Sequence, residues 1–427
     1  MAIHYLLGWP VPDSHYPEQV LVYGRGVALS FRNSAHRSER ALLISFAGQV
    51  LKYLSISGFY ILLPGLQAGL GLTNAQIGLV STSRNAASAA TCLPAGAATD
   101  RLQGNATILV GLGLILCGLS MVILGLATSL WVAVAGASAG GIGMLVHTPA
   151  SVSLLAANFP ERRSFAIAIF GAGGSVGQVL APLAAGGLAA AVAWETGFLA
   201  MGVPVIAGGV VIWVWLSRLS LEKRGGLSFS QYLSTVRSAV SNRLILLLLA
   251  LMVCYGLVEP AIVTFLPIHL EVDRGYNTST MALFIAGSQL AGIFSQPALG
   301  HLSDKIGRLG VLAGSFLLFG ATALAVPLVG KDLPLLLAIL AMGVVLFPLL
   351  SLFFTAVTDE AGEGAQGTAL SLTGLAFFPP ASVSPFAAGL LADAFSVGAV
   401  FYIAGGIALG TGLIAVAAAF RRSTLRF

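Results

Sequence analysis

Four ionisable side chains interrupt stretches of the sequence that are otherwise almost wholly apolar. They are Lys52, Arg84, His147 and Glu259. A charged side chain at the centre of a bilayer costs about 2.5 to 3.5 kcal/mol on insertion scales, so it needs a partner or a function. A lysine offers an anion a point charge, an arginine offers it a planar fork of donors, and a carboxyl group can exchange a proton. The four residues therefore indicate a site where an anion and a proton bind.

The composition places these residues in a membrane protein. Of the 427 residues, 57% are hydrophobic and only 9% are charged, whereas about 25% are charged in soluble domains. The formal net charge of +5 would suggest nucleic-acid binding in a soluble protein, but basic cytoplasmic loops explain it in a membrane protein. We therefore expect contact with the lipid bilayer and no nucleic-acid partner.

The apolar runs predict twelve membrane-spanning α-helices. A helix needs about 20 mainly apolar residues to cross the hydrocarbon core, and runs of this length recur with short breaks. They are too continuously apolar for the strands of a membrane barrel, which alternate over about ten residues. The predicted spans are 42–66, 75–98, 106–127, 130–155, 165–190, 197–217, 244–268, 279–300, 309–330, 333–357, 366–391 and 397–420.

Lysine and arginine residues fall mainly on one side of the predicted membrane. With the amino terminus inside, seventeen lie on the cytoplasmic side and two, Arg274 and Lys331, lie on the opposite side. Because positive residues are retained in cytoplasmic loops, we predict cytoplasmic termini in a protein of the bacterial inner membrane. Residues 1–40 lack the pattern of a secretory signal, and we expect them to form a mobile tail.

The two halves of the sequence repeat each other at an offset of 203 to 204 residues. Pro64, Gly96, Asp100, Pro182 and Gly186 correspond to Pro267, Gly300, Asp304, Pro385 and Gly389. Since each half carries six predicted helices, both halves insert in the same direction, as a parallel repeat. The predicted fold is an all-α polytopic membrane protein with two parallel-repeat six-helix bundles. Its segments are a tail at 1–40, a bundle at 41–217, a cytoplasmic linker at 218–243 and a bundle at 244–427.

A short polar motif follows the second predicted helix of each half. The second copy contains Gly300, Asp304, Lys305, Gly307 and Arg308, and the first keeps Gly96, Asp100 and Arg101. Together with the helix count and the repeat, this pattern resembles the signature of the major facilitator superfamily of secondary transporters over about residues 41–420. The resemblance implies that the motif gates the two bundles during alternating access. A topology anchor that does not change between states is the alternative.

The fifth predicted helix combines glycines with a proline. We expect Gly177, Pro182 and Gly186, with Pro385 in the second repeat, to bend helices and to let them pack closely. The stretch 147–186 is similar to the superfamily branch that includes the fosmidomycin-resistance exporters. It is also similar to the fifth-helix motif of antiporters, although Ala181 stands where that motif has a glycine. No strand precedes these glycines, which excludes a nucleotide-binding loop.

The resemblance implies that eight of the helices surround a central cavity, and all four ionisable residues fall on these helices. Polar residues also recur at helical spacing on the first helix, which favours a water-filled cavity over lipid contact. Tyr255 occupies the position in the second repeat that Lys52 occupies in the first. The residues expected to bind the substrate are Lys52, Arg84, His147, Gln49, Tyr53 and Tyr255.

Glu259, next to Pro260, is the candidate for proton coupling, because burial of a carboxyl group favours its neutral form. By the repeat, Lys52 and Glu259 are expected at similar depths on opposing bundles. They form either a permanent structural ion pair or one that breaks during transport, and both alternatives remain open. For His147, the alternative to substrate binding is a hydrogen bond to a backbone group.

These features together predict a secondary transporter that couples export of a small organic anion or antimetabolite to protons. The alternatives are a multidrug exporter of neutral or cationic compounds, an uptake facilitator for an organic anion, and a receptor built on a transporter fold. The three cysteines are dispersed and the ionisable groups do not cluster. We therefore expect no catalytic residues, no metal site and no cofactor. The expected partners are a small molecule and protons, and the expected state is a monomer.

Overall fold

The computed structural model describes residues 21–101, 106–159, 162–216, 242–361 and 366–424. These residues form helices joined by short turns, and they contain no strand. The predicted all-α fold is therefore confirmed. Most of the predicted linker, and the first half of the predicted tail, lie outside the described residues.

The first bundle contains six helices. They are α2 (Leu21–Leu70), α3 (Asn74–Arg101), α4 (Ala106–Gly125), α5 (Leu130–Asn158), α6 (Arg163–Ala191) and α7 (Trp194–Leu216). Each helix contains one of the first six predicted spans, to within two residues at its ends. α2 begins well before the predicted span, so the second half of the predicted tail continues the first membrane helix.

The second bundle contains the remaining six spans, and two of them are broken. Its elements are α9 (Arg243–Ile268), the π-helical turn η3 (His269–Asp273), α10 (Thr278–Ile306), α11 (Arg308–Ala325), α12 (Leu333–Leu346), α13 (Pro348–Ala361), α14 (Gln366–Ala381), α15 (Ser384–Ala394) and α16 (Val397–Thr424). The tenth span divides at Pro348, which has no amide hydrogen for the helix ladder. The eleventh divides after Pro379 and Pro380.

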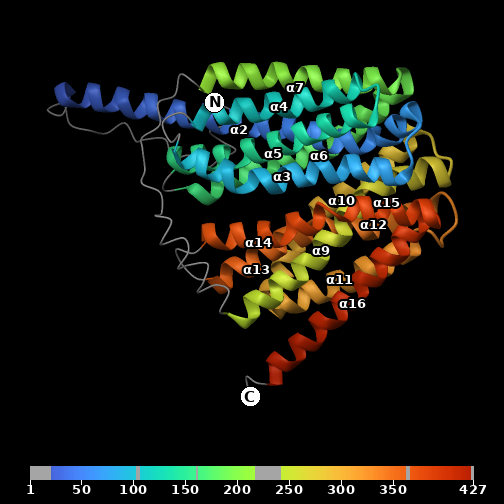
Figure 1. Ribbon diagram of the computed structural model, residues 1–427. Helices are drawn as coiled ribbons and strands as arrows, with labels where there is room; N and C mark the ends of the chain where they lie inside the picture. The colour runs from blue at the N-terminus through green and yellow to red at the C-terminus, as the bar shows by residue number, and fades with distance from the viewer. Residues whose placement is uncertain (1–20, 102–105, 160–161, 217–241, 362–365, 425–427) are drawn as a thin grey trace.

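Eleven stretches of the described helices are long and apolar enough to cross a membrane. The remaining predicted span is α3, which has 28 residues but carries several polar side chains. Figure 1 shows α3 on the side of the first bundle that faces the second, and it packs against α15 and α14 there. Protein therefore covers much of its polar surface, so a lower hydropathy is compatible with a membrane position.

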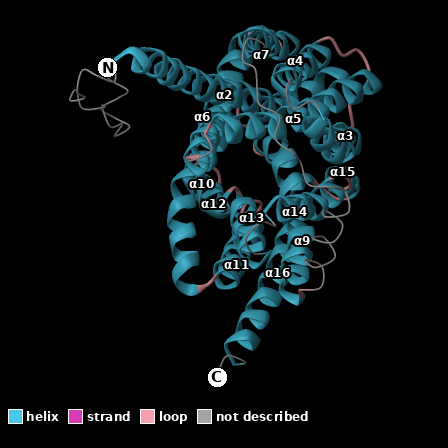
Figure 2. Ribbon diagram, turned by 90° about the vertical axis from the view of Figure 1, so that its left-hand side faces the viewer, coloured by secondary structure: helices cyan, strands magenta, loops and turns pink. Residues whose placement is uncertain are grey.

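The two bundles approach each other on one side of the molecule and diverge toward the other (Figure 1). The start of α2 and the end of α16 lie on the same side, which we call the terminal side. On the opposite side, α15 packs against α3 and α10 packs against α6. The view in Figure 2 shows the same two groups of helices, α2–α7 and α9–α16, from a second direction.

Close backbone contacts hold the bundles together on the side opposite the termini. A Cβ atom at Gly78 in α3 would overlap the carbonyl group of Pro385, and one at Gly389 in α15 would overlap the carbonyl group of Asn74. Between α6 and α10, Ser279 Oγ donates a hydrogen bond of 3.0 Å to the carbonyl oxygen of Gly186. Repeat-related pairs of helices therefore make both contacts.

The four residues expected to bend helices lie in different settings. α6 continues through Pro182 without a break, and Gly177 lies where α6 packs against the backbone of Val50 in α2. Pro385 lies in the first turn of α15. A proline is tolerated there because the first amide groups of a helix have no helical acceptor. Pro385 therefore begins a helix directly after the break between α14 and α15, and its role in bending stays a prediction.

Asp393 adds a charged contact to this interface. It lies in the last turn of α15, and its two carboxylate oxygens accept hydrogen bonds from the amide groups of Asn74 at 2.9 Å and Ala75 at 2.8 Å. These amides begin α3, where the helix dipole favours a negative charge. By the repeat, Ala190 occupies the corresponding position of the first half. The α3–α15 contact therefore has a carboxylate that the α6–α10 contact lacks.

We predict that Asp393→Ala weakens the contact between α15 and α3. Loss of a helix-capping acceptor costs about 1 kcal/mol, which is about a fivefold change in the ratio of closed to open molecules. Distances between spin labels on the ends of the two helices measure this ratio. Asp393→Asn keeps one acceptor oxygen and should give an intermediate ratio. An unchanged distance distribution in Asp393→Ala would contradict the prediction.

Candidate substrate and proton site

Lys52 is buried inside the first bundle, with 3% of its surface exposed. Its Nζ atom donates a hydrogen bond of 3.1 Å to Thr148 Oγ1 on α5 and lies 4.8 Å from the centroid of the Tyr53 ring. No described carboxylate pairs with it. Its ammonium group thus keeps donors free for a ligand, since it has three and uses one.

Arg84 on α3 is buried to the same degree, with 2% of its surface exposed. Its guanidinium carbon lies 4.7 Å from the centroid of the Phe59 ring, an attractive cation–π arrangement. Both terminal nitrogens, Nη1 and Nη2, lack a hydrogen-bond partner among the described residues. Buried polar groups are nearly always partnered, so this arginine is suited to a ligand that supplies acceptors.

The two cations lie in the same part of the first bundle. Each is within electrostatic range of the thiol of Cys117 on α4, and neither forms an ion pair with a described residue. Two positive groups and no nearby described acid within this bundle create a region that attracts anions.

Gln49 and Tyr53 lie next to Lys52 on α2, where this helix meets α6. Both pack against Gly174, whose missing side chain makes room for them. Gln49 has 6% of its surface exposed, and its Oε1 atom has no hydrogen-bond partner among the described residues. The structure therefore brings Gln49, Lys52 and Tyr53 together, as the helical spacing predicted.

His147 is packed within the first bundle. It is fully buried, and Nδ1 lies 3.0 Å from the carbonyl oxygen of Val110, while Nε2 lies 3.3 Å from Ser151 Oγ. Its ring stacks on Phe170 at a centroid distance of 6.2 Å. Both ring nitrogens are occupied by protein groups in this state, which favours the structural role that the sequence left open.

Tyr255 also has a partner inside its own bundle. Its hydroxyl donates a hydrogen bond of 2.9 Å to the carbonyl oxygen of Leu346, next to the break between α12 and α13. Ser295 donates to the carbonyl of Val344, which Pro348 leaves without a helical amide donor. In this state Tyr255 therefore stabilises a broken helix, and its contact with a ligand stays a prediction.

Glu259 on α9 is half-buried and faces the first bundle. It lies within electrostatic range of Tyr53 and Tyr60 on α2 and of Tyr255 on its own helix. No salt bridge joins it to Lys52, whose ammonium group binds Thr148 instead. The permanent ion pair that the sequence left open is therefore absent in this state. Tyr60 is within electrostatic range of both the cation Arg84 and the acid Glu259.

Two polar residues that the sequence analysis missed lie near this site on α10. Ser288 and Gln289 are buried and line a pocket between the bundles with Ser57 and Tyr60 of α2. Both are neutral, so a search for charges in apolar runs passes over them. Comparison of the two repeats could have identified them, because an offset of 204 residues makes Ser288 the equivalent of Arg84 in the second half.

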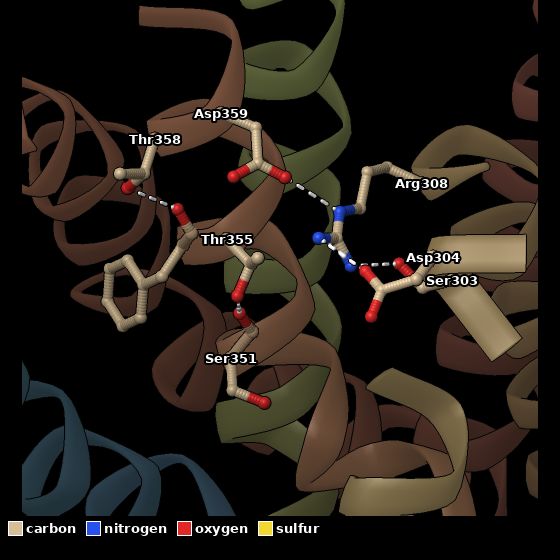
Figure 3. A network of polar contacts seen from close by, with 8 residues as sticks. Ser303, Asp304, Arg308, Ser351, Thr355, Thr358 and Asp359 are labelled. Carbon is tan, nitrogen blue, oxygen red and sulfur yellow. Dashed lines mark hydrogen bonds and ion pairs between the residues drawn. The ribbon is translucent and has the colours of Figure 1, made fainter. Parts of the chain in front are cut away.

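The complete copy of the polar motif forms a network of polar contacts around Arg308 in the second bundle (Figure 3). Arg308 forms a salt bridge of 2.7 Å with Asp304 and one of 2.9 Å with Asp359 at the end of α13. Its Nη1 atom also donates to Ser303 Oγ at 2.6 Å. Asp359, which the sequence analysis did not include, thus makes the motif a link between α10, α11 and α13.

The glycines of this motif differ in their roles. Gly307 joins α10 to α11 with φ +91°, a conformation that side chains with a Cβ atom rarely adopt. A Cβ atom at Gly300 would meet no described atom within 4 Å, so no other helix packs closely against this glycine in this state. Lys305 is exposed. The side chains of Gly96, Asp100 and Arg101, in the first copy, lie outside the described ones.

Comparisons with known proteins agree with this architecture. Residues 45–385 match the Major Facilitator Superfamily. The probable sulfoacetate transporter SauU of Cupriavidus necator is 25% identical over an alignment 392 residues long, which covers 86% of this chain and 90% of that protein. The resemblance to the fosmidomycin-resistance exporters gains no support from this relative.

Solved structures share the fold at low sequence identity. A bacterial homolog of the human lysosomal transporter Spinster, inward-facing and unoccupied, has a TM-score of 0.74 at 17% identity, covering 90% of this chain and 95% of that chain. A POT family transporter in complex with 5-aminolevulinic acid has a TM-score of 0.72 at 15% identity, covering 90% and 96%. The nucleoside transporter NupG has a TM-score of 0.73 at 12% identity, covering 88% and 99%.

The fold, the repeat and the match over most of the chain give one conclusion. The chain belongs to the major facilitator superfamily, whose members are secondary transporters, and it is not an enzyme. Among the described residues, no group of three or more histidine, cysteine or acidic side chains is placed to hold a metal ion.

We predict that Gly307→Ala lowers the midpoint of thermal unfolding, whereas Gly300→Ala does not. A backbone conformation that only glycine adopts readily costs about 1 to 3 kcal/mol with another residue. Gly300 has open space around it and ordinary helical geometry. Unfolding of the purified variants in the same detergent measures both effects. Equal midpoints for the two variants would contradict the prediction.

Proposed function

We propose that this protein carries a small organic anion across the membrane by alternating access, with Arg84 and Lys52 as its binding cations. The main observation behind the proposal is that the two terminal nitrogens of Arg84 are buried and have no hydrogen-bond partner among the described residues. A buried cation without an ionic partner is unfavourable, and a bound anion would supply that partner. The planar fork of an arginine matches the oxygens of a carboxylate or a sulfonate.

The curated relative supports an acidic substrate. That relative is a probable sulfoacetate transporter, and sulfoacetate bears one sulfonate and one carboxylate group. Two cations in one bundle suit an anion with two acid groups, because each group can meet its own positive charge. The proposed class is therefore small organic anions, with sulfonates and dicarboxylates of similar size as the first compounds to test.

Proton coupling is proposed to take place at Glu259. Tyr60 lies within electrostatic range of both Glu259 and Arg84, so an anion at Arg84 would repel an ionised Glu259 in a medium of low dielectric constant. Anion binding and protonation of Glu259 would then favour each other, and linkage makes the effect reciprocal. This coupling moves the anion and the proton in the same direction. Export, expected from the sequence, would require them to move in opposite directions.

The orientation belongs to the same proposal. By the predicted spans, most of the basic residues belong to loops on the same side of the membrane as the two termini, and the positive-inside rule assigns that side to the cytoplasm. The bundles diverge toward this side (Figure 1), so the described state would be open to the cytoplasm. Under a proton gradient directed into the cell, the proposed coupling results in uptake.

Arg84→Gln tests the binding site, and we predict at least a tenfold loss of affinity for sulfoacetate. Saturating ligand at about 100 times its dissociation constant should stabilise the wild type by about 2.7 kcal/mol, which a thermal shift assay detects. Arg243→Gln makes the same change at an exposed position and should leave the affinity unchanged. Stabilisation by lipophilic cations alone, with no effect of small anions, would contradict the proposal and support the multidrug alternative.

Glu259→Gln tests proton coupling separately from binding. This variant resembles the protonated state, so in proteoliposomes we predict that it still exchanges labelled sulfoacetate for unlabelled sulfoacetate. It should no longer accumulate the anion in response to a pH gradient. Accumulation equal to that of the wild type would contradict the role of Glu259. In the wild type, anion movement against the flow of protons would support export.

A further inference from the structure

A pocket between the two bundles contains polar groups that neither cation uses. Its cavity volume is about 30 Å³, which is enough for one small polar group. Ser57 and Tyr60 of α2 and Ser288 and Gln289 of α10 supply its polar side chains, and residues of α9 and α12 supply an apolar wall. Gln289 has 7% of its surface exposed, and its Oε1 atom has no hydrogen-bond partner among the described residues. The pocket therefore contains a buried amide with unused hydrogen-bonding capacity.

This pocket adjoins the site of Arg84. Tyr60 lines the pocket and is within electrostatic range of the guanidinium group. Phe59, the residue before it on α2, supports that group with its ring. Tyr60 is therefore shared by the pocket and by the electrostatic surroundings of Arg84.

The repeat places the two parts of this site at equivalent positions. An offset of 204 residues relates Arg84 to Ser288. A Cβ atom at Gly141 in α5 would overlap the carbonyl of Arg84, and one at Gly343 in α12 would overlap the carbonyl of Ser288. The same close helix contact thus supports both positions. The first half presents a cation there, and the second half presents a hydroxyl group followed by an amide.

We propose that Ser288 and Gln289, with Ser57 and Tyr60, form a second subsite that binds an uncharged polar group of the transported anion. The inference rests on the proposed function, because Arg84 holds the acid group. No lysine or arginine lines the pocket, so a hydroxyl or carbonyl group suits it better than a second acid group. An amide and hydroxyl groups can both donate and accept hydrogen bonds to such a group. The preferred substrates are then anions that carry a hydroxyl or carbonyl function.

The subsite also contacts both bundles, since α2 belongs to the first and α10 to the second. A ligand that binds both stabilises the arrangement in which they lie together and contributes nothing once they separate. The uncharged group would thus select substrates at the step in which the bundles close around the anion.

Two sulfonates that differ only in a hydroxyl group test this subsite. They are ethanesulfonate and 2-hydroxyethanesulfonate, and calorimetric titration of the purified full chain gives their dissociation constants. We expect the wild type to bind the hydroxylated compound about fivefold more tightly, the ratio that a hydrogen bond of about 1 kcal/mol gives. Gln289→Leu should remove this ratio while leaving the affinity for ethanesulfonate within about twofold. Gln296→Leu makes the same change at an exposed position two turns along α10 and should keep the ratio.

Equal affinity of the wild type for both compounds would overturn the proposal, as would a ratio that survives in Gln289→Leu. An equal loss of both affinities in that variant would also overturn it, because a packing defect has that effect. Ser288→Ala, a smaller change, should lower the ratio without affecting the affinity for ethanesulfonate, and no change in the ratio would count against the subsite.

If neither sulfonate binds the wild type, the proposed function fails. Binding of both through Arg84 with no preference contradicts only the subsite.

Discussion

Two positive charges without a carboxylate partner lie inside the first bundle, and the features of the candidate site follow from them. Each costs about 2.5 to 3.5 kcal/mol to place in a membrane interior. The ring of Phe59 and the hydroxyl of Thr148 recover part of this cost, because cation–π contacts and single hydrogen bonds contribute about 1 kcal/mol each. An anion that binds to the two cations can offset the remaining cost of burying them. Strong binding then comes from groups that the ligand-free protein leaves unpaired.

The contacts between the bundles explain how such a site can change its access. On the side opposite the termini, α3 and α15 approach so closely that glycine is required at Gly78 and Gly389, and Asp393 caps α3. On the terminal side, the described salt bridges of Arg308 stay within the second bundle. The interaction that joins the bundles is therefore concentrated at one side. Alternating access requires this side to separate while the other side closes.

The sequence predicts the helices and the repeat well, because length, apolarity and periodicity are local properties. It also predicts that Lys52 and Arg84 are buried. It does not predict which prolines break a helix, since α6 continues through Pro182 and the tenth span breaks at Pro348. That outcome depends on donors such as Ser295 from a neighbouring helix. The sequence also does not predict the hydrogen-bond partners of His147 and Tyr255, which are backbone carbonyl groups of other helices. Gln289 escapes notice because a neutral amide has no charge to mark it.

The most direct test of the central claim is a structure of the wild-type protein determined with and without sulfoacetate. The account predicts that the ligand-free protein leaves both terminal nitrogens of Arg84 without a protein partner. In the complex, an acid group should lie within hydrogen-bond distance, about 2.7 to 2.9 Å, of these nitrogens. A carboxylate of the protein paired with Arg84 in the ligand-free state would contradict the account. An anion bound away from both Arg84 and Lys52 would contradict it equally.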